Sequence, residues 1–106
     1  MSTLAKAILG EAQKTMPLVD VLSMVEPTDM GRTWEEAFRS IELNHYRSDP
    51  AHWDKFLDSI RQNGIKHPVY IEIYNGRLQL LRGHHRVWAA HKLGIQNVPV
   101  TIATRK

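Results

Sequence analysis

Four consecutive residues, Gly83-His84-His85-Arg86, combine the groups that can hold a phosphate. The apolar residues before them favour a strand, and the residues after them, up to Leu93, favour a helix. A helix that starts here directs free backbone N–H groups and the positive end of its dipole at one point. The glycine lets a ligand approach the backbone, and the arginine supplies a bidentate donor. The turn is therefore predicted to bind a phosphate-bearing ligand.

The two histidines of this turn could donate a hydrogen bond, act as acid or base, or bind a metal ion. The alternative, that both rings only cap or pack the helix, stays open at this point. No metal site is predicted, because the chain has no cysteine and no pair of histidines at a fixed ligand spacing.

Charge is unevenly spread along the 106 residues. The segment from Arg77 to Lys106 holds six of the fourteen basic residues and none of the eleven acidic ones. Since this segment contains the turn, an anionic partner is favoured over a merely solvated basic surface. No apolar run is long enough for a transmembrane helix or a signal-peptide core. We therefore expect a cytoplasmic protein without a membrane partner, of a length typical of one domain.

The first 40 residues are predicted to form a helical and extended extension. Apolar spacing favours a helix over residues 3–14, and Pro17 interrupts it. Residues 17–22 are interpreted as a strand or extended segment. Thr33 and Glu36 form a capping-box pattern, which predicts a helix from Trp34 to about Ser40.

The remaining residues, 41–106, are predicted to form the main part of one compact unit. Residues 41–47 are interpreted as a strand or extended loop. Asp49-Pro50 is typical of a helix start, and the helix is expected to end at Asn63-Gly64. Alternating residues predict a strand over 69–74. Asn75-Gly76 predicts a hairpin turn, followed by a strand over 77–82, a helix over about 84–93 and a final strand over 98–103.

The segment Gly83–Ala90, with Leu93-Gly94 and Val98-Pro99-Val100 after it, resembles the signature of the ParB/sulfiredoxin superfamily. The upstream stretch from Ser59 to Ile71 agrees with the same family pattern. The likeness covers roughly residues 41–102. It implies an α+β fold, in which a small mixed β-sheet is flanked by helices.

The resemblance also implies nucleotide binding, with CTP or ATP as the nucleoside triphosphate and Mg²⁺ as its companion. Carried over by position, the phosphate-binding residues are Gly83, His84, His85 and Arg86, with Arg47 as a second arginine. His84 takes the place of a glutamate in ParB-like proteins and of the catalytic cysteine in sulfiredoxins. Sulfiredoxin chemistry is excluded, because the chain has no cysteine.

The favoured function is a ParB-like domain that binds nucleotide or nucleic-acid phosphates, in a DNA-associated regulatory protein of a phage or plasmid. A homodimer is plausible, since ParB-like domains often pair. Two alternatives stay open. One is an enzyme, either a ParB-like nuclease or a phosphoryl-transfer protein, with His84 as the catalytic base. The other is a degenerate fold that serves as a protein-interaction adaptor.

Overall fold

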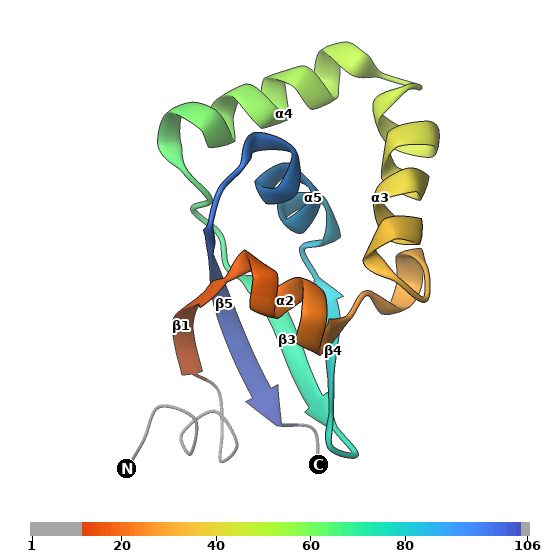
Figure 1. Ribbon diagram of the computed structural model, residues 1–106. Helices are drawn as coiled ribbons and strands as arrows, with labels where there is room; N and C mark the ends of the chain where they lie inside the picture. The colour runs from red at the N-terminus through yellow and green to blue at the C-terminus, as the bar shows by residue number, and fades with distance from the viewer. Residues whose placement is uncertain (1–11, 105–106) are drawn as a thin grey trace.

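A mixed β-sheet forms one side of the molecule (Figure 1). The structure, a computed structural model, describes residues 12–104. Within these residues the sheet has five strands in the order β1-β5-β3-β4-β2. The strands are β1 (Ala12–Pro17), β2 (Val25–Glu26), β3 (Val69–Tyr74), β4 (Arg77–Arg82) and β5 (Asn97–Thr104). Neighbours β3 and β5 run parallel, as do β2 and β4, whereas β1–β5 and β3–β4 are antiparallel.

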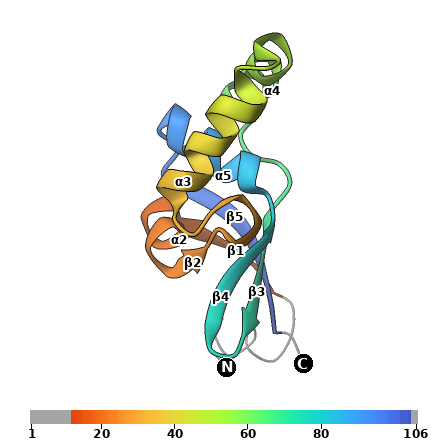
Figure 2. The same cartoon turned by 90° about the vertical axis from the view of Figure 1, so that its right-hand side faces the viewer.

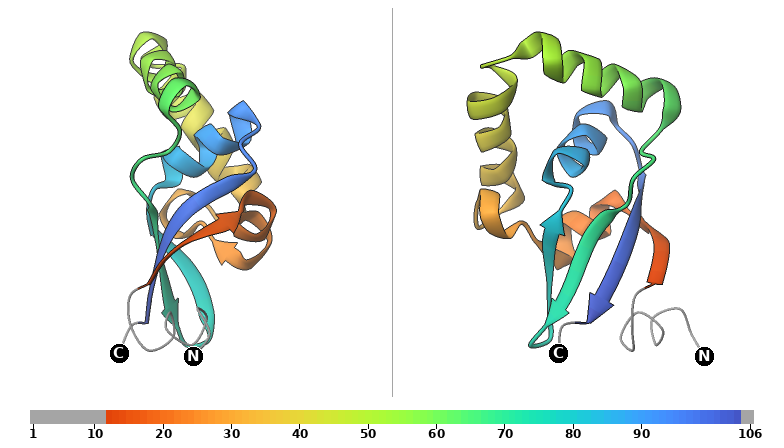
Figure 3. Two further views of the ribbon diagram at one scale, coloured as in Figure 1. Left: turned by 90° about the vertical axis from the view of Figure 1, so that its left-hand side faces the viewer. Right: turned by 180° about the vertical axis from the view of Figure 1, so that it is seen from behind.

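The helices gather on one face of the sheet and beyond one end of its strands. They are α2 (Leu18–Met24), the short η1 (Thr28–Met30), α3 (Trp34–Ile41), the π-helical η2 (Glu42–Tyr46), α4 (Pro50–Asn63) and α5 (His84–Leu93). Helices α3 and α4 form an L-shaped bracket around α5 (Figure 1). The β3–β4 hairpin turn lies at the opposite end of the molecule from α4 (Figure 2). Seen from behind, the strands lie in front of α2, so α2 covers the face of the sheet that is turned toward the viewer in Figure 1 (Figure 3).

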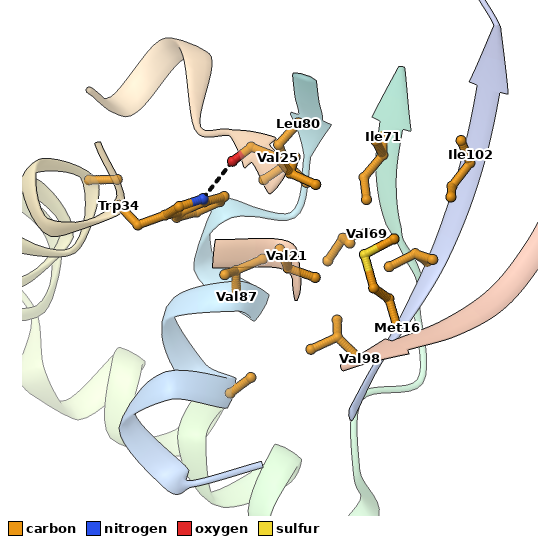
Figure 4. Packing of buried hydrophobic residues seen from close by; sticks show 13 residues of the cluster. Met16, Val21, Val25, Trp34, Val69, Ile71, Leu80, Val87, Val98 and Ile102 are labelled. Carbon is orange, nitrogen blue, oxygen red and sulfur yellow. Dashed lines mark hydrogen bonds between the residues drawn. The ribbon is translucent and has the colours of Figure 1, made fainter. Parts of the chain in front are cut away.

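Helix α5 is buried on nearly all sides because it belongs to two apolar clusters. Val87 and Ala90 pack with residues of the sheet, α2 and α3, including Val69 and Trp34 (Figure 4). Trp88, which is 1% exposed, and Ala89 pack against α4 and the end of α3. Its exposed residues, His91 and Lys92, lie in the last turn. The start of α5 is therefore held in place from two directions.

Several predicted elements are confirmed at the residue level. The Thr33 hydroxyl accepts a hydrogen bond from the Glu36 amide at 3.1 Å, so Thr33 caps α3. Helix α4 starts at Pro50 and ends before Gly64. Asn75 and Gly76 both have positive φ, as a type I′ hairpin turn requires. Strand β4 and helix α5 follow at the predicted positions.

Three predictions are wrong. The helix expected over 3–14 fails at residues 12–14, which pair with β5 in strand β1; residues 3–11 lie outside the described part. The extended segment expected over 17–22 is mostly helix α2, because Leu18, Val21 and Leu22 share one helical face that packs on the core.

The segment expected to be extended over 41–47 continues α3 as η2. The Arg47 amide donates to the Glu42 carbonyl at 3.0 Å, five residues earlier. Buried Ile41 anchors the junction of α3 and η2 in the second apolar cluster. Short π-helical segments of this kind occur frequently at functional sites.

Strands from both sides of residue 40 belong to this one sheet, since β1 pairs with β5 and β2 pairs with β4. The division of the chain into residues 1–40 and 41–106 stays a prediction. Within the described residues, no helix has the length and apolarity needed to cross a membrane.

Candidate functional site

The turn between β4 and α5 is shaped by Gly83. Its φ is +106°, in the left-handed region that favours glycine. A Cβ atom built on this residue would lie 2.6 Å from Cγ1 of Val69 in β3. The close approach predicted for this glycine is thus made by a neighbouring strand, and the requirement for glycine is structural.

The amides of the first turn of α5 point out of the helix end. Gly83, the N-cap residue, has no side chain that could cap them. The first hydrogen bond back to the turn is made by the Val87 amide, which donates to the Gly83 carbonyl at 3.0 Å. The amides of the three residues between have no intrahelical acceptor. The start of α5 therefore has the free amides and the dipole end on which the predicted phosphate site depends, and phosphate binding there stays a prediction.

Arg86 lies at the edge of a pocket of about 260 Å³ between α4 and the start of α5. Its Nη1 donates to the carbonyls of Pro68 at 2.6 Å and His67 at 3.3 Å. Burial lowers the pKa of its guanidinium. Both hydrogen bonds use Nη1 alone, so the other nitrogens of the guanidinium keep N–H donors for a ligand. The polar lining of the pocket also includes Ser59 and Lys66.

His85 lies in an aromatic group contributed by three elements. Its ring stacks on Trp53 of α4, with centroids 4.5 Å apart and planes 11° apart. Its ring also meets the edge of the His45 ring of η2 at 4.9 Å. Within the described residues, His85 Nε2 is buried and has no hydrogen-bond partner. Burial, reinforced by the nearby charges of His45, His84 and Arg86, lowers the pKa of His85 to about 4. The ring is therefore neutral near pH 7.

His84 turns away from the pocket into the protein. It is 7% exposed, and its Nε2 lies 2.6 Å from the carbonyl oxygen of Pro27. Because a carbonyl only accepts, Nε2 must be the donor. The catalytic role predicted for His84 stays a prediction, and it would require this hydrogen bond to break.

Arg47 lies at the C-cap of η2, two residues after His45. Its side chain is exposed, and the structure records no contact from it to the turn within residues 12–104. The structure thus brings Gly83, His85 and Arg86 together at one helix end. It directs the His84 ring inward, to the Pro27 carbonyl, and leaves the Arg47 side chain exposed.

Sequence reasoning missed the part that α4 and the following loop contribute to the site. Ser59 and Lys66 were inside the stretch that resembles the family pattern, but no role was assigned to them. Trp53 of α4 is half-buried, with its ring face against His85. The resemblance over residues 59–71 was the signal that could have identified this side of the pocket.

Two basic side chains of the C-terminal segment form salt bridges with glutamates from earlier in the chain. Arg77 pairs with Glu26 at 2.5 Å, and its hydrogen bond lowers the pKa of that carboxyl. Lys92 pairs with Glu42 at 2.8 Å. Burial acts to raise the pKa of Glu42, but hydrogen bonds from Lys92 and Trp88 outweigh it, and the net shift is downward. Uncompensated positive charge therefore remains nearest the turn, where exposed Arg82 precedes Gly83.

Metal-ligating side chains do not cluster in residues 12–104: no group of three could hold a metal ion. Any Mg²⁺ at this site would have to be held largely by the phosphates of a ligand, as is common for this ion.

Comparison with known proteins identifies the fold. The ParB N-terminal domain family model matches residues 38–106. No curated protein matches the chain. A solved structure of sulfiredoxin from Arabidopsis thaliana has 22% identity and a TM-score of 0.55, and the match covers 90% of this chain and 85% of that one.

Two ParB structures are similar to the same degree. The first is C-terminally truncated ParB from Caulobacter crescentus complexed with CTP-gamma-S, with 20% identity, a TM-score of 0.54 and coverage of 90% of this chain. The second is a Pnob8-like ParB-N domain, with 14% identity, a TM-score of 0.57 and coverage of 91%. The matches span 44% and 30% of those two chains. At such identities the likeness shows the fold, and it confirms the predicted α+β class.

Proposed function

Because the chain belongs to the ParB N-terminal domain family, we propose that it binds the phosphates of a nucleoside triphosphate at the Gly83–Arg86 turn. The position of Arg86 is the observation that carries the proposal. It is the charged group that borders both the uncapped start of α5 and the pocket beside α4. A ligand that reaches from this pocket to the start of α5 would meet a guanidinium and backbone N–H groups together, which is the chemistry that phosphate requires.

Each residue of the turn has a separate part in this binding. Gly83 permits the turn, and the amides that follow it donate to the phosphate oxygens. Arg86 neutralises charge, and its contacts with the carbonyls of His67 and Pro68 hold the guanidinium in place. His85 donates from its ring, and Arg47 approaches from η2 when the ligand is present.

CTP or ATP with Mg²⁺ is the proposed ligand. One structural neighbour, the Caulobacter crescentus ParB, is described as complexed with CTP-gamma-S, which supports a nucleotide over an isolated phosphate. A role in a cytoplasmic, DNA-associated regulatory protein of a phage or plasmid, with DNA as partner and a homodimer as the assembly, extends the same proposal.

Binding without turnover is proposed over a nuclease or phosphoryl-transfer activity. A general base must be able to reach the proton that it removes. The candidate base, His84, is 7% exposed and its Nε2 is engaged by the Pro27 carbonyl. The geometry therefore favours a binding module.

Ligand-induced thermal stabilisation tests the proposal. CTP, ATP, GTP and a short DNA duplex are added, each with and without Mg²⁺, to the wild type, Arg86→Ala and Arg39→Ala. A ligand at one hundred times its Kd stabilises the native state by about 2.7 kcal/mol. For a domain of this size, each kcal/mol raises the melting temperature by roughly 4 °C or more. Loss of a charged hydrogen bond of about 1.5–3 kcal/mol predicts a Kd at least about tenfold weaker for Arg86→Ala.

Arg39→Ala is the matched control, because Arg39 is an exposed arginine of α3 that pairs with Glu35 at 3.8 Å, within its own helix. Shifts are compared with each variant's own ligand-free melting temperature, since Arg86→Ala also loses its contacts with the loop. Equal shifts in both variants would place the ligand elsewhere. No shift with any nucleotide or DNA would contradict the proposal and favour the protein-interaction adaptor.

A further inference from the structure

Two buried aromatic rings hold the backbone of one short segment, Val25–Met30. His84 of α5 donates from Nε2 to the Pro27 carbonyl at 2.6 Å. Trp34 of α3 donates from Nε1 to the Val25 carbonyl at 2.8 Å (Figure 4). The two ring centroids are 6.3 Å apart. Carbonyls two residues apart are thus held by side chains from two different helices.

The same segment is fastened to the sheet on its other side. The Thr28 hydroxyl donates to the Leu80 carbonyl of β4 at 2.6 Å, and Glu26 accepts from Arg77. Thr28 has φ +44°, which is rare for a β-branched residue and persists only where the surroundings enforce it. Because the segment is strained, its geometry depends on these contacts.

We propose that His84 is a positioning residue, which fixes the first turn of α5 against Val25–Met30 and couples that segment to whatever the turn binds. The ligand part of this statement rests on the proposed function. The Pro27 carbonyl is buried, and without the His84 donor it would keep only the longer hydrogen bond from the Met30 amide, at 3.5 Å, which is a costly exchange for a buried acceptor. The adjacent His85 faces Trp53 and His45 instead, so the two histidines of the turn have opposite roles.

The coupling between the ligand-binding turn and the Val25–Met30 segment follows from their short separation, since both are contacted by His84. The backbone of His84 belongs to the first turn of α5, and its ring ends on the Pro27 carbonyl. A ligand that fixes the amides of this turn also fixes the direction of the His84 ring. The ligand thus favours the ordered form of the Val25–Met30 segment by some factor. By thermodynamic linkage, the ligand must bind more weakly by this same factor when the segment is loosened.

Hydrogen exchange by NMR tests the clamp without any ligand. The probes are the Trp34 indole N–H and the Met30 amide, which donates to the Pro27 carbonyl at 3.5 Å. His84→Gln keeps an N–H donor on a chain of suitable length, and His84→Met has similar length without a donor. We expect exchange about tenfold faster in His84→Met and near wild-type rates in His84→Gln. Equal rates in all three proteins would overturn the proposal.

A measurement on the wild type covers the case in which His84→Met does not fold. The ring nitrogens of His84 are observed in long-range ¹⁵N–¹H spectra, which report which nitrogen carries the hydrogen. A proton on Nε2 that is protected from solvent is expected. A ring with hydrogen only on Nδ1 could not donate to Pro27, and this result would also overturn the clamp.

Titration with CTP–Mg²⁺ and ATP–Mg²⁺ tests the coupling. We expect ligand to slow exchange at Trp34 and Met30 in the wild type and in His84→Gln, and Kd to rise about tenfold in His84→Met. An unchanged Kd in a His84→Met protein with fast exchange would reduce His84 to a purely structural residue and overturn the positioning role. If the wild type binds neither nucleotide, the proposed function fails, and the exchange rates alone still decide whether the clamp exists.

Discussion

At the scale of single residues, the turn depends on the different surroundings of two adjacent histidines: His84 is directed at the Pro27 carbonyl, and His85 packs on Trp53 and His45. Residue types alone located the turn at Gly83-His84-His85-Arg86, and the structure places it at the start of α5 as predicted. The sequence could not say which ring faces inward. That direction depends on Pro27, Trp53 and the elements that carry them, which lie far away in the chain.

The lowered pKa of His85 predicts how acid affects stability. The folded pKa is about 4, lowered by burial and then by His45, whereas an unfolded histidine titrates near 6.5. Between these values the unfolded chain binds more protons than the folded one. The contribution of neutral His85 to the free energy of unfolding is fully present above about pH 6.5 and is lost as pH falls through the folded pKa.

Urea denaturation of the wild type at several pH values between 6.5 and 4.5 measures this loss. His85→Phe, which keeps a ring against Trp53 but cannot titrate, should show a smaller decline over the same range. Carboxyls such as Glu26, whose pKa is lowered, act below this window. Parallel declines in the two proteins would show that His85 is not the group responsible.

At the scale of elements, the contact between the β4–α5 junction and β3 fixes where the turn lies. Gly83→Ala would place a Cβ against Val69 in a backbone conformation that alanine rarely adopts. Backbone strain of about 1–3 kcal/mol adds to overpacking of about 1–3 kcal/mol. The unfolding free energy should fall by roughly 2–6 kcal/mol, as measured by urea denaturation.

Gly94→Ala is the matched control for this prediction. Gly94 also has positive φ, +71°, but a Cβ there would meet nothing within 4 Å. The unfolding free energy of Gly94→Ala should fall by about 1–2 kcal/mol, the cost of the left-handed conformation alone. Val69→Ala removes the contact with Cγ1 but keeps Cβ at 2.8 Å, so the double variant should lose less stability than the sum of the two single variants. If both glycine variants are equally destabilised, the contact with β3 contributes nothing.

Elements that depend on local signals were predictable, and those that depend on distant partners were not. The capping box at Thr33, the Asp49-Pro50 helix start and the Asn75-Gly76 turn all involve residues within a few positions of one another. Strand β1 exists because it pairs with β5, and no local pattern contains that information. Pro17 was interpreted as an interruption, although it precedes α2 as its N-cap residue.

At the scale of the whole molecule, the first part of the chain completes the sheet. Strands β1 and β2 form its two edges, and Val21, Val25 and Trp34 belong to the same core as β3 and β5. A fragment of residues 41–106 would expose this core and the edges of β5 and β4 that pair with β1 and β2. It should show no cooperative thermal transition and little spectral dispersion by NMR. A folded fragment would establish residues 41–106 as an independent domain.

The order of the strands has a consequence for the time course of folding. The β3–β4 hairpin pairs residues such as Tyr74 and Arg77, so it can form as soon as it leaves the ribosome. Strand β1 is synthesised well before its partners, which begin at Asn97. Its pairing groups therefore stay uncovered until β5 has been synthesised. Long-range pairing of this kind slows folding, and a strand that waits for its partner is exposed to aggregation and to capture by chaperones.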